Sequence, residues 1–279
     1  MTTTLRPSEP LQRSADGGRS RTYDICVNGR VVGSVHVSTD PGFGPATGVI
    51  KSLRVAEPYR GRGRGTVAAL ASEEVLRDWG CRQVLVQVPT AVEPALRMAR
   101  SLGYTERSRN MVKELPERPA ALPPGFEVRS MIEAEFGPWE AGAREKYARS
   151  WIERGMPADQ ARAKAEAGHR ELLPNGLATP GMAFHLAVRD GQVVGRVWTG
   201  FRDVEPGTRG GYVYDIEVVE EHRGHGYGRA LMLLAEQTVR AAGERLLGLH
   251  VFTGNTPAIR LYESLGYRTT CLNSAKSLL

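Results

Sequence analysis

Residues 217–234 read EVVEEHRGHGYGRALMLL and place three glycines at alternate positions between an apolar run and a helix-forming run. Backbone N–H groups in such a turn can point into one concavity, and a following helix adds its unpaired amides and positive dipole end. Glycine is needed where a Cβ would block a ligand or where φ is positive. The stretch predicts a strand, a turn that can hold a diphosphate, and a helix. A plain strand-to-helix turn is the alternative.

The chain repeats itself at an offset of 163 residues. Residues 48–115 and 211–278 share 24 identities in 68 ungapped pairs, which indicates a duplication. Upstream, VNGRVVG (27–33) corresponds to RDGQVVG (189–195), and both predict a hairpin with Asn-Gly or Asp-Gly in a tight turn.

Two related domains follow from this repeat. We expect a first domain over 1–115, a proline-rich linker over 116–124 and a second domain over 125–279. Each copy orders a hairpin, a strand, the glycine turn, a helix, a strand, a helix and a last strand, which predicts an α/β fold with α+β layers. Each domain is expected to be a mixed, mostly antiparallel, twisted sheet flanked by helices.

Composition excludes several classes of protein. No apolar run is long enough to cross a bilayer, and the N-terminal residues do not resemble a secretory signal, so we expect no membrane association and a cytoplasmic location. The three cysteines have no metal-binding spacing, so no metal site is expected. Residues 1–124 hold 18 Lys and Arg against 12 Asp and Glu, but no aromatic pattern accompanies them, so we expect no nucleic-acid partner.

The Arg-x-x-Gly-x-Gly turn after a strand, followed about thirty residues later by NTPAIRLYESLGY, resembles the GNAT superfamily of acyl-CoA-dependent N-acetyltransferases. The resemblance covers nearly all of residues 125–279 and, more weakly, residues 20–115. The tandem layout is similar to that of mycothiol synthase, although no motif identifies that substrate.

The resemblance implies acetyl-CoA as acyl donor and assigns residues to it. The backbone of Ile216, Glu217 and Val218 would pair with the pantetheine arm, and Asn255 would hydrogen-bond the coenzyme. Tyr262 would protonate the departing thiolate. The turn amides would hold the pyrophosphate, from residues Arg223, Gly224, His225, Gly226, Tyr227, Gly228 and Arg229.

The two copies differ at these positions. Asn255 aligns with Val92 and Tyr262 with Ala99, so the proposed acid is absent from the first copy. The second copy also gives over fifty residues to a region that is short and rich in turn residues in the first. In the resembling family, helices there wall the acceptor site. We therefore expect the first domain to be a degenerate scaffold, with coenzyme binding left open, and the second to be catalytic.

Candidates for the general base are His250, whose imidazole titrates near neutrality, and Glu217. Glu217 alternates with Asp215 on one strand face, so either carboxylate could instead bind a cationic acceptor. Acids on the acceptor helices would favour such an amine if they lie close to the cleft, and most helix charges simply face water. These acids are Glu133, Glu135, Glu140, Glu145 and Glu153.

We therefore expect an N-acetyltransferase that transfers an acetyl or related acyl group from acetyl-CoA to the primary amine of a small molecule or peptide. Attack would be direct, in a ternary complex, because a thioester is already activated. The alternative is a non-catalytic sensor or scaffold that binds acyl-CoA. Oligomeric state and acceptor identity cannot be read from these residues.

Overall fold

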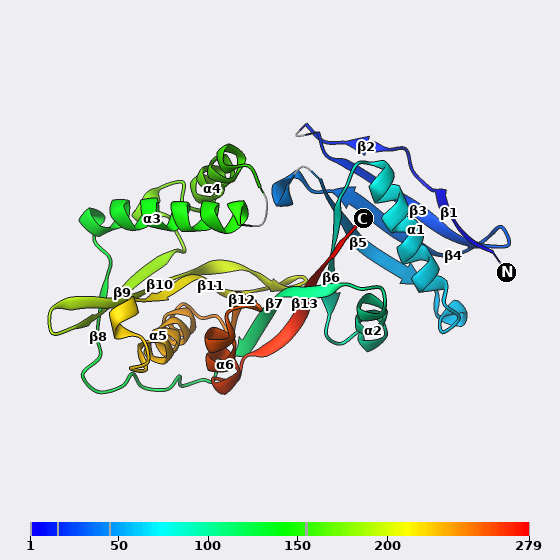
Figure 1. Ribbon diagram of the computed structural model, residues 1–279. Coiled ribbons are helices and arrows are strands. Elements are labelled where there is room, and N and C mark those ends of the chain that lie inside the picture. The colour runs from blue at the N-terminus through cyan, green and yellow to red at the C-terminus, as the bar shows by residue number, and fades with distance from the viewer. Residues whose placement is uncertain (1, 16, 45, 154–155, 279) are drawn as a thin grey trace. The chain divides into compact units, whose positions relative to one another are not determined.

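The computed structural model of the chain describes residues 2–15, 17–44, 46–153 and 156–278. It divides into two compact units, which consist of residues 1–108 with 271–279 and of residues 109–270. Each unit layers helices on a mixed sheet (Figure 1), which confirms the expected fold class.

The first unit has the strand order β1-β3-β4-β5-β6-β13. Strands β5 and β6 are parallel, and the other pairings described are antiparallel. Its elements are β1 (Thr3–Pro7), β2 (Gln12–Arg13), β3 (Arg19–Val27), β4 (Arg30–Thr39), η1 (Pro41–Phe43), β5 (Thr47–Val55), η2 (Glu57–Tyr59), α1 (Arg64–Asp78), β6 (Gln83–Pro89), α2 (Glu93–Ser101) and the start of β7 (Thr105–Glu114).

The second unit has the strand order β7-β12-β11-β10-β9-β8, with β11 and β12 parallel. Its elements after β7 are β8 (Glu127–Ser130), α3 (Glu133–Ile152), α4 (Ala158–Leu172), η3 (Gly176–Ala178), β9 (Ala183–Arg189), β10 (Gln192–Glu205), β11 (Thr208–Val218), η4 (Glu220–His222), α5 (Tyr227–Ala241), β12 (Leu246–Phe252), α6 (Thr256–Ser264) and the start of β13 (Arg268–Ser277).

Both predicted hairpin turns are confirmed. Asn28 and Gly29 have φ of 50° and 81°, and Asp190 and Gly191 have φ of 50° and 77°. Two successive positive φ values are what the type I′ turn of a two-residue hairpin requires. The turn residues therefore set the register of β3 on β4 and of β9 on β10.

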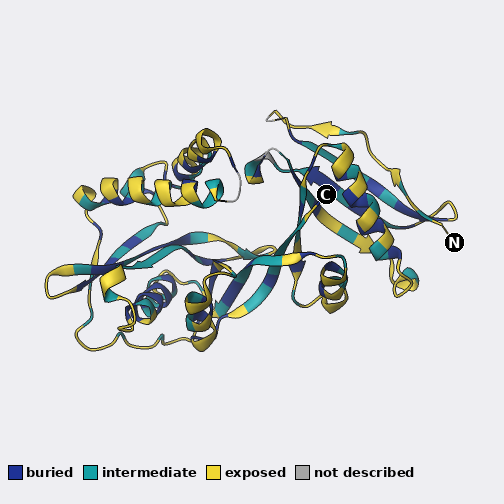
Figure 2. Ribbon diagram, in the orientation of Figure 1, coloured by how far each residue is buried: buried dark blue, intermediate teal, exposed yellow. Residues whose placement is uncertain are grey.

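Helices cover both faces of the sheet in the second unit (Figure 1). Helix α5 turns a fully buried face, including Leu231 and Met232, toward one side of the sheet, as the dark ribbon in Figure 2 shows. On the other side, Trp139 of α3 packs edge-on against Phe184 and Trp198, with ring centroids 5.0 and 5.5 Å apart. The sheet is therefore the middle layer of three.

The central parallel strands of the second unit separate along their length. β11 pairs with β12 only from Gly211 to Val213, opposite Leu247 to Leu249. A bulge in the β10–β11 ladder at Trp198/Thr199 lies at the point where this pairing ends. Bulges bend a strand and increase its twist, so the remaining residues of β11 diverge from β12. An opening results between the two strands.

The last strand of each repeat is shared between the units. Residues 271–277 of β13 pair antiparallel with β6, and thus belong to the first unit. Residues 109–114 of β7 belong to the second unit, where Leu115 donates its backbone N–H to the Arg245 carbonyl at 2.7 Å. Each sheet is therefore completed by a strand end from the other repeat.

A buried ion pair holds each shared strand in place. In the second unit, the Lys113 ammonium lies 2.7 Å from both oxygens of Glu236 and 5.7 Å from the Tyr267 ring centroid. In the first unit, the Lys276 ammonium lies 2.6 Å from Glu73 and 5.7 Å from the Tyr104 ring. The corresponding residues of the two repeats are therefore exchanged, with each lysine paired to the other repeat's glutamate.

The compact units consequently end elsewhere than the sequence-based domains. The sequence places residues 109–115 in the first domain and 271–279 in the second, whereas compactness places them in the opposite units. The physical reason is the exchange of strand ends, which no linker composition signals.

We expect Lys113→Ala to destabilise the protein by about 3–5 kcal/mol, because it leaves the Glu236 carboxylate, 1% exposed, without its counter-charge. Urea unfolding followed by tryptophan fluorescence would measure this. Lys51→Ala, at an exposed position, is the matched control. A loss below about 1 kcal/mol for Lys113→Ala would mean that the pair does not hold the strand.

Candidate functional site

The glycine turn of the second unit presents a run of backbone donors. Gly224 and Gly226 have φ of 81° and 84°, and Gly226 is the N-cap of α5. Among the described residues, no acceptor is found for the backbone N–H groups of residues 224–229; the next amide, of Ala230, donates to the Gly226 carbonyl at 3.1 Å. A Cβ built on Gly224 or Gly226 meets no atom within 4 Å. The turn is therefore an open cradle for an anion.

Helix α6 packs directly against this turn. A Cβ on Gly228 would lie 3.3 Å from Leu261 of α6, so the missing side chain permits a close approach of the two helices. Asn255 is the N-cap of α6, and its Oδ1 accepts a hydrogen bond from the Ala258 N–H at 3.3 Å. Asn255 is exposed, so its predicted coenzyme-binding role falls to the side-chain NH2 group.

Several predicted residues lie at the strand opening. Ile216, Glu217 and Val218 pair with β10 on one edge of β11. They come after Val213, the last residue that β11 pairs with β12, so their other edge is not paired with β12. His250 directly follows Leu249, the last residue of β12 that pairs with β11. It is exposed, and its ring lies 4.9 Å from that of Phe252. The opening is thus flanked by Asp215 on one strand and His250 on the other.

Tyr262 is buried, with 6% of its surface exposed, on α6. Burial, together with the negative charge of Asp215, raises the pKa of its phenol to about 12. The phenol is therefore protonated throughout the neutral range. Its ring belongs to the core cluster that includes Tyr227 and Leu231, and its centroid lies 6.0 Å from that of Tyr267.

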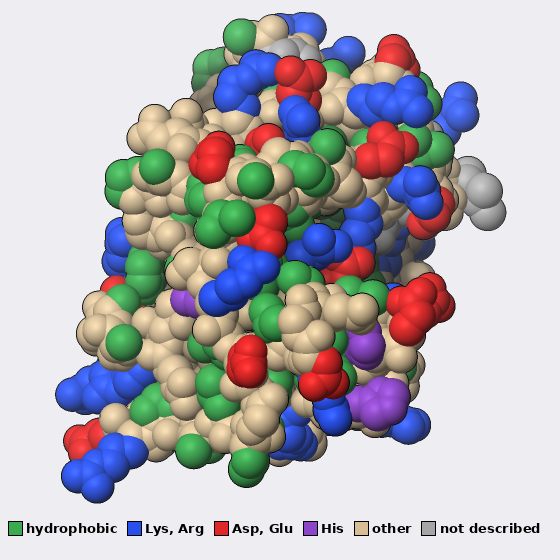
Figure 3. Space-filling view, turned by 90° about the vertical axis from the view of Figure 1, so that its left-hand side faces the viewer, with side chains coloured by type: hydrophobic (Ala, Val, Ile, Leu, Met, Phe, Trp, Pro, Cys, Tyr) green, Lys and Arg blue, Asp and Glu red, His purple; other side chains and the backbone are tan. Residues whose placement is uncertain are grey.

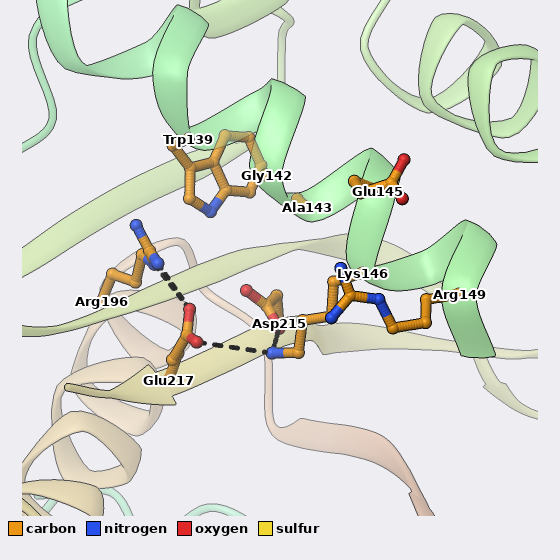
Figure 4. Close-up of a pocket in the computed structure, with 9 residues that line it drawn as sticks. All are labelled: Trp139, Gly142, Ala143, Glu145, Lys146, Arg149, Arg196, Asp215 and Glu217. Carbon is orange, nitrogen blue, oxygen red and sulfur yellow. Dashed lines mark hydrogen bonds and ion pairs between the residues drawn. The ribbon is translucent and has the colours of Figure 1, made fainter. Parts of the chain in front are cut away.

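A cavity of about 350 Å³ lies between α3 and strands β10 and β11. Figure 4 shows charged side chains facing one another across it, with Lys146 reaching from α3 toward Asp215 and Glu217. Its lining residues are Trp139, Gly142, Ala143, Glu145, Lys146, Arg149, Arg196, Asp215 and Glu217.

The two carboxylates of β11 differ in their partners. Arg196 holds one oxygen of Glu217 through two hydrogen bonds of 2.6 and 3.0 Å. Although burial raises the pKa of Glu217, these bonds and the Lys146 charge outweigh it and hold the pKa below its usual value. For Asp215, burial dominates and raises the pKa, with Lys146 opposing it. Asp215 is therefore the better proton acceptor of the two.

The acids of α3 that were predicted to lie near an acceptor also differ in their surroundings. Glu145 lines the cavity, whereas Glu135 caps α3 and pairs with Arg129 at 2.6 Å, which lowers the pKa of Glu135 to about 2. Sequence reasoning missed Lys146, Arg149 and Arg196. The helical spacing of Trp139, Ala143 and Lys146 on one face of α3 is the only sequence signal that points to the first of these.

The first unit repeats the cradle without the rest of the site. Gly61 and Gly63 have φ of 72° and 70°, and Gly63 is the N-cap of α1. Ala99 stands in place of Tyr262, and only the short strand β2 lies between β1 and β3, where the second unit has α3, α4 and η3 between β8 and β9. The first unit therefore has no described helix in this region.

Charge is mixed on the face of the molecule drawn in Figure 3, where acidic and basic side chains are interspersed. No three His, Cys, Asp or Glu residues within the described ranges are grouped so that they could hold a metal ion. In the same ranges, no helix has both the length and the apolar character needed to span a bilayer.

Comparison with curated proteins gives relatives that match most of this chain. The chain is 31% identical over 262 residues to a mycothiol acetyltransferase of Acidothermus cellulolyticus, covering 86% of this chain and 73% of that protein. It is 32% identical over 281 residues to a mycothiol acetyltransferase of Nocardiopsis dassonvillei, covering 92% and 81%. The N-acetyltransferase YycN of Bacillus subtilis, described as uncharacterized, is 31% identical over 147 residues, covering 52% and 93%.

Solved structures agree with the fold. A GCN5-related N-acetyltransferase from Sphaerobacter thermophilus superposes with a TM-score of 0.60 at 20% identity, over 92% of this chain and 80% of that one. A tandem GNAT protein from the clavulanic acid biosynthesis pathway gives 0.52 at 19% identity, over 95% and 85%.

The sequence profile of the acetyltransferase (GNAT) family matches residues 3–104 and again residues 143–267, one match for each repeat. Together with the relatives, these two matches show that the chain is a tandem acyltransferase that belongs to the GNAT family.

Proposed function

We propose that the second unit transfers an acetyl group from acetyl-CoA to a primary amine by direct attack in a ternary complex. The observation that carries this is the run of backbone N–H groups at residues 224–229, for which the described residues supply no acceptor, next to the helix α6 that carries the buried, protonated Tyr262. The first unit, which lacks the phenol and the acceptor helices, would serve as scaffold.

The residues present fit the acyl donor. The turn amides, with the positive end of α5, would hold its diphosphate, and the free edge of β11 at residues 216–218 would pair with its amide-bearing arm. The exposed side-chain amide of Asn255 would add a further hydrogen bond. When bound, acetyl-CoA supplies an activated thioester, so no covalent enzyme intermediate is required.

The chain's own groups would then handle the charges. Asp215 and Glu217 would hold the acceptor's ammonium in the cavity, where Lys146 now lies 3.8 Å from each of them. Asp215, or His250 across the opening, would take the proton that the amine loses. Tyr262, whose phenol is protonated at neutral pH, would donate that proton to the departing sulfur.

Acceptor identity is proposed from the relatives. Two of them, matched over most of both chains, are mycothiol acetyltransferases, so the acceptor of those enzymes heads the panel of amines to be tested. The carboxylates of the cavity favour a cationic amine, which puts polyamines, aminoglycosides and peptide N-termini next on that panel.

With a reactive amine from this panel, we expect Tyr262→Phe to lower kcat by about 10² to 10⁴ while acetyl-CoA binding measured by calorimetry is retained. The mass of the acetylated product should be followed, because an acceptor with its own thiol would mask the released coenzyme. Tyr23→Phe, a buried tyrosine of the first unit, is the matched control. Tight acetyl-CoA binding without turnover of any amine would instead favour a sensor.

Gly226→Ala tests the cradle. The alanine would strain a residue with φ of 84° and so displace the neighbouring N–H donors, and we expect the KM for acetyl-CoA to rise about tenfold, as for the loss of one charge-assisted hydrogen bond. Gly63→Ala imposes the same backbone strain in the first unit, at φ of 70°. Equal KM values for the two variants would contradict a diphosphate site at residues 223–229.

The protonation state of Tyr262 can be tested through stability. A folded pKa of about 12 against about 10 in the unfolded chain means that the folded state holds the proton longer, so stability falls as pH rises above 10. Between pH 10 and 11, we expect wild type to lose about 1 kcal/mol more than Tyr262→Phe in urea unfolding. Equal losses would place the phenol in contact with water.

A further inference from the structure

The chain contains five lysines, and one of them reaches into the acceptor cavity. Lys113 and Lys276 are held in the buried ion pairs with glutamate. Lys51 is exposed on β5, and Lys164 lies 4.8 Å from the Trp151 ring on the helix pair α3 and α4. Among these lysines, Lys146 alone lines the cavity.

The Lys146 ammonium is held there by charge rather than by hydrogen bonds. Its Nζ lies 3.8 Å from Asp215 Oδ1 and 3.8 Å from Glu217 Oε1, beyond the 2.7–3.2 Å of an N–H···O bond. The side chain is 60% exposed, while Arg196 already satisfies the other oxygen of Glu217 at 2.6 Å. Lys146 can therefore change rotamer at little cost.

This position coincides with the proposed reaction centre. Asp215 and Glu217, the two carboxylates 3.8 Å from the Lys146 Nζ, flank Ile216, one of the residues proposed to run beside the acyl donor. A primary amine and two carboxylates thus meet in the cavity beside the strand proposed to hold the acyl donor. The cavity therefore already contains a primary amine, which is the functional group that the proposed acceptor would carry.

We propose that Lys146 is an intramolecular acetyl acceptor, so that the protein acetylates itself at this residue when acetyl-CoA is present without another amine. This proposal rests on the proposed function. It names a modification site on the chain in addition to the transfer to a separate acceptor.

The step balances without a further reactant. The Lys146 ammonium first releases one proton to water; the neutral nitrogen then forms a bond to the acetyl carbon, and the thioester C–S bond breaks. The sulfur takes the phenolic proton of Tyr262, and the nitrogen's excess proton passes to the Asp215 carboxylate. Proton exchange with water restores both side chains. The products are N-acetyl-lysine and the free thiol of coenzyme A.

Acetylation would also alter the cavity. The amide carries no charge, so Asp215 and Glu217 would lose the cation that faces both of them in Figure 4. The longer neutral side chain would then occupy the space proposed for the acceptor. The modified protein should consequently turn over a cationic amine more slowly than the unmodified protein.

The test is peptide mass spectrometry of the full-length protein incubated with acetyl-CoA alone, with Lys51 as the control within the same molecule. We expect acetylation of Lys146 to be about tenfold or more faster than that of Lys51. Tyr262→Phe should slow it about tenfold or more at Lys146 and leave Lys51 unchanged, because only the former uses the phenol. Lys146→Arg should abolish the fast mass increase, and Lys51→Arg should not.

Equal rates at Lys146 and Lys51, or a rate at Lys146 that does not respond to Tyr262→Phe, would overturn the proposal, since an exposed lysine reacts slowly with acetyl-CoA on its own. The amine panel separates this failure from that of the proposed function. Turnover of an external amine without acetylation of Lys146 removes the self-acetylation alone. Absence of both removes the two proposals together.

Discussion

The early end of the pairing between β11 and β12 is the constraint on which the site depends. Only three residues of each strand pair before the bulge at Trp198/Thr199 turns β11 away. The unpaired edge of β11, the carboxylates at 215 and 217 and the imidazole at 250 all lie beyond that point. The glycine turn and α5 then follow directly from the end of the same strand. A sheet paired along its whole length would leave no room for a second molecule between these strands.

Most of the turns and helix ends around the site could be predicted from local signals in the sequence. The Asn-Gly and Asp-Gly dipeptides, Gly226 at the start of α5 and Gly243 and Gly266 after α5 and α6 all take the positive φ that their positions require. Such signals act within a few residues, so a single sequence suffices to interpret them. The strand exchange could not be predicted in this way. Asn110 and Lys113 match Asn273 and Lys276 in the duplicated pattern, so either strand end satisfies either sheet as far as the residues show.

The cavity shows a second limit of sequence reasoning. Asp215 and Glu217 alternate on one strand and look equivalent in the sequence, yet their environments differ because Arg196 on the neighbouring strand bonds only to Glu217. Which carboxylate keeps its proton more readily thus depends on burial, which dominates at Asp215, and on the Arg196 hydrogen bonds, which lower the pKa of Glu217. Lys146 was missed for a related reason, since a charged residue on a helix usually faces water.

Because the strand ends are exchanged, the linker at residues 116–124 is not needed to hold the two repeats together. If the backbone were cleaved within residues 116–124, each fragment would still supply a strand to the other fragment's sheet. Lys113 of the first fragment would pair with Glu236, and Lys276 of the second would pair with Glu73. The two fragments would stay together as a noncovalent heterodimer. Either half expressed alone would have an unpaired sheet edge and a buried glutamate without its lysine. Duplication in this chain has therefore produced two halves that are obligate partners rather than independent modules.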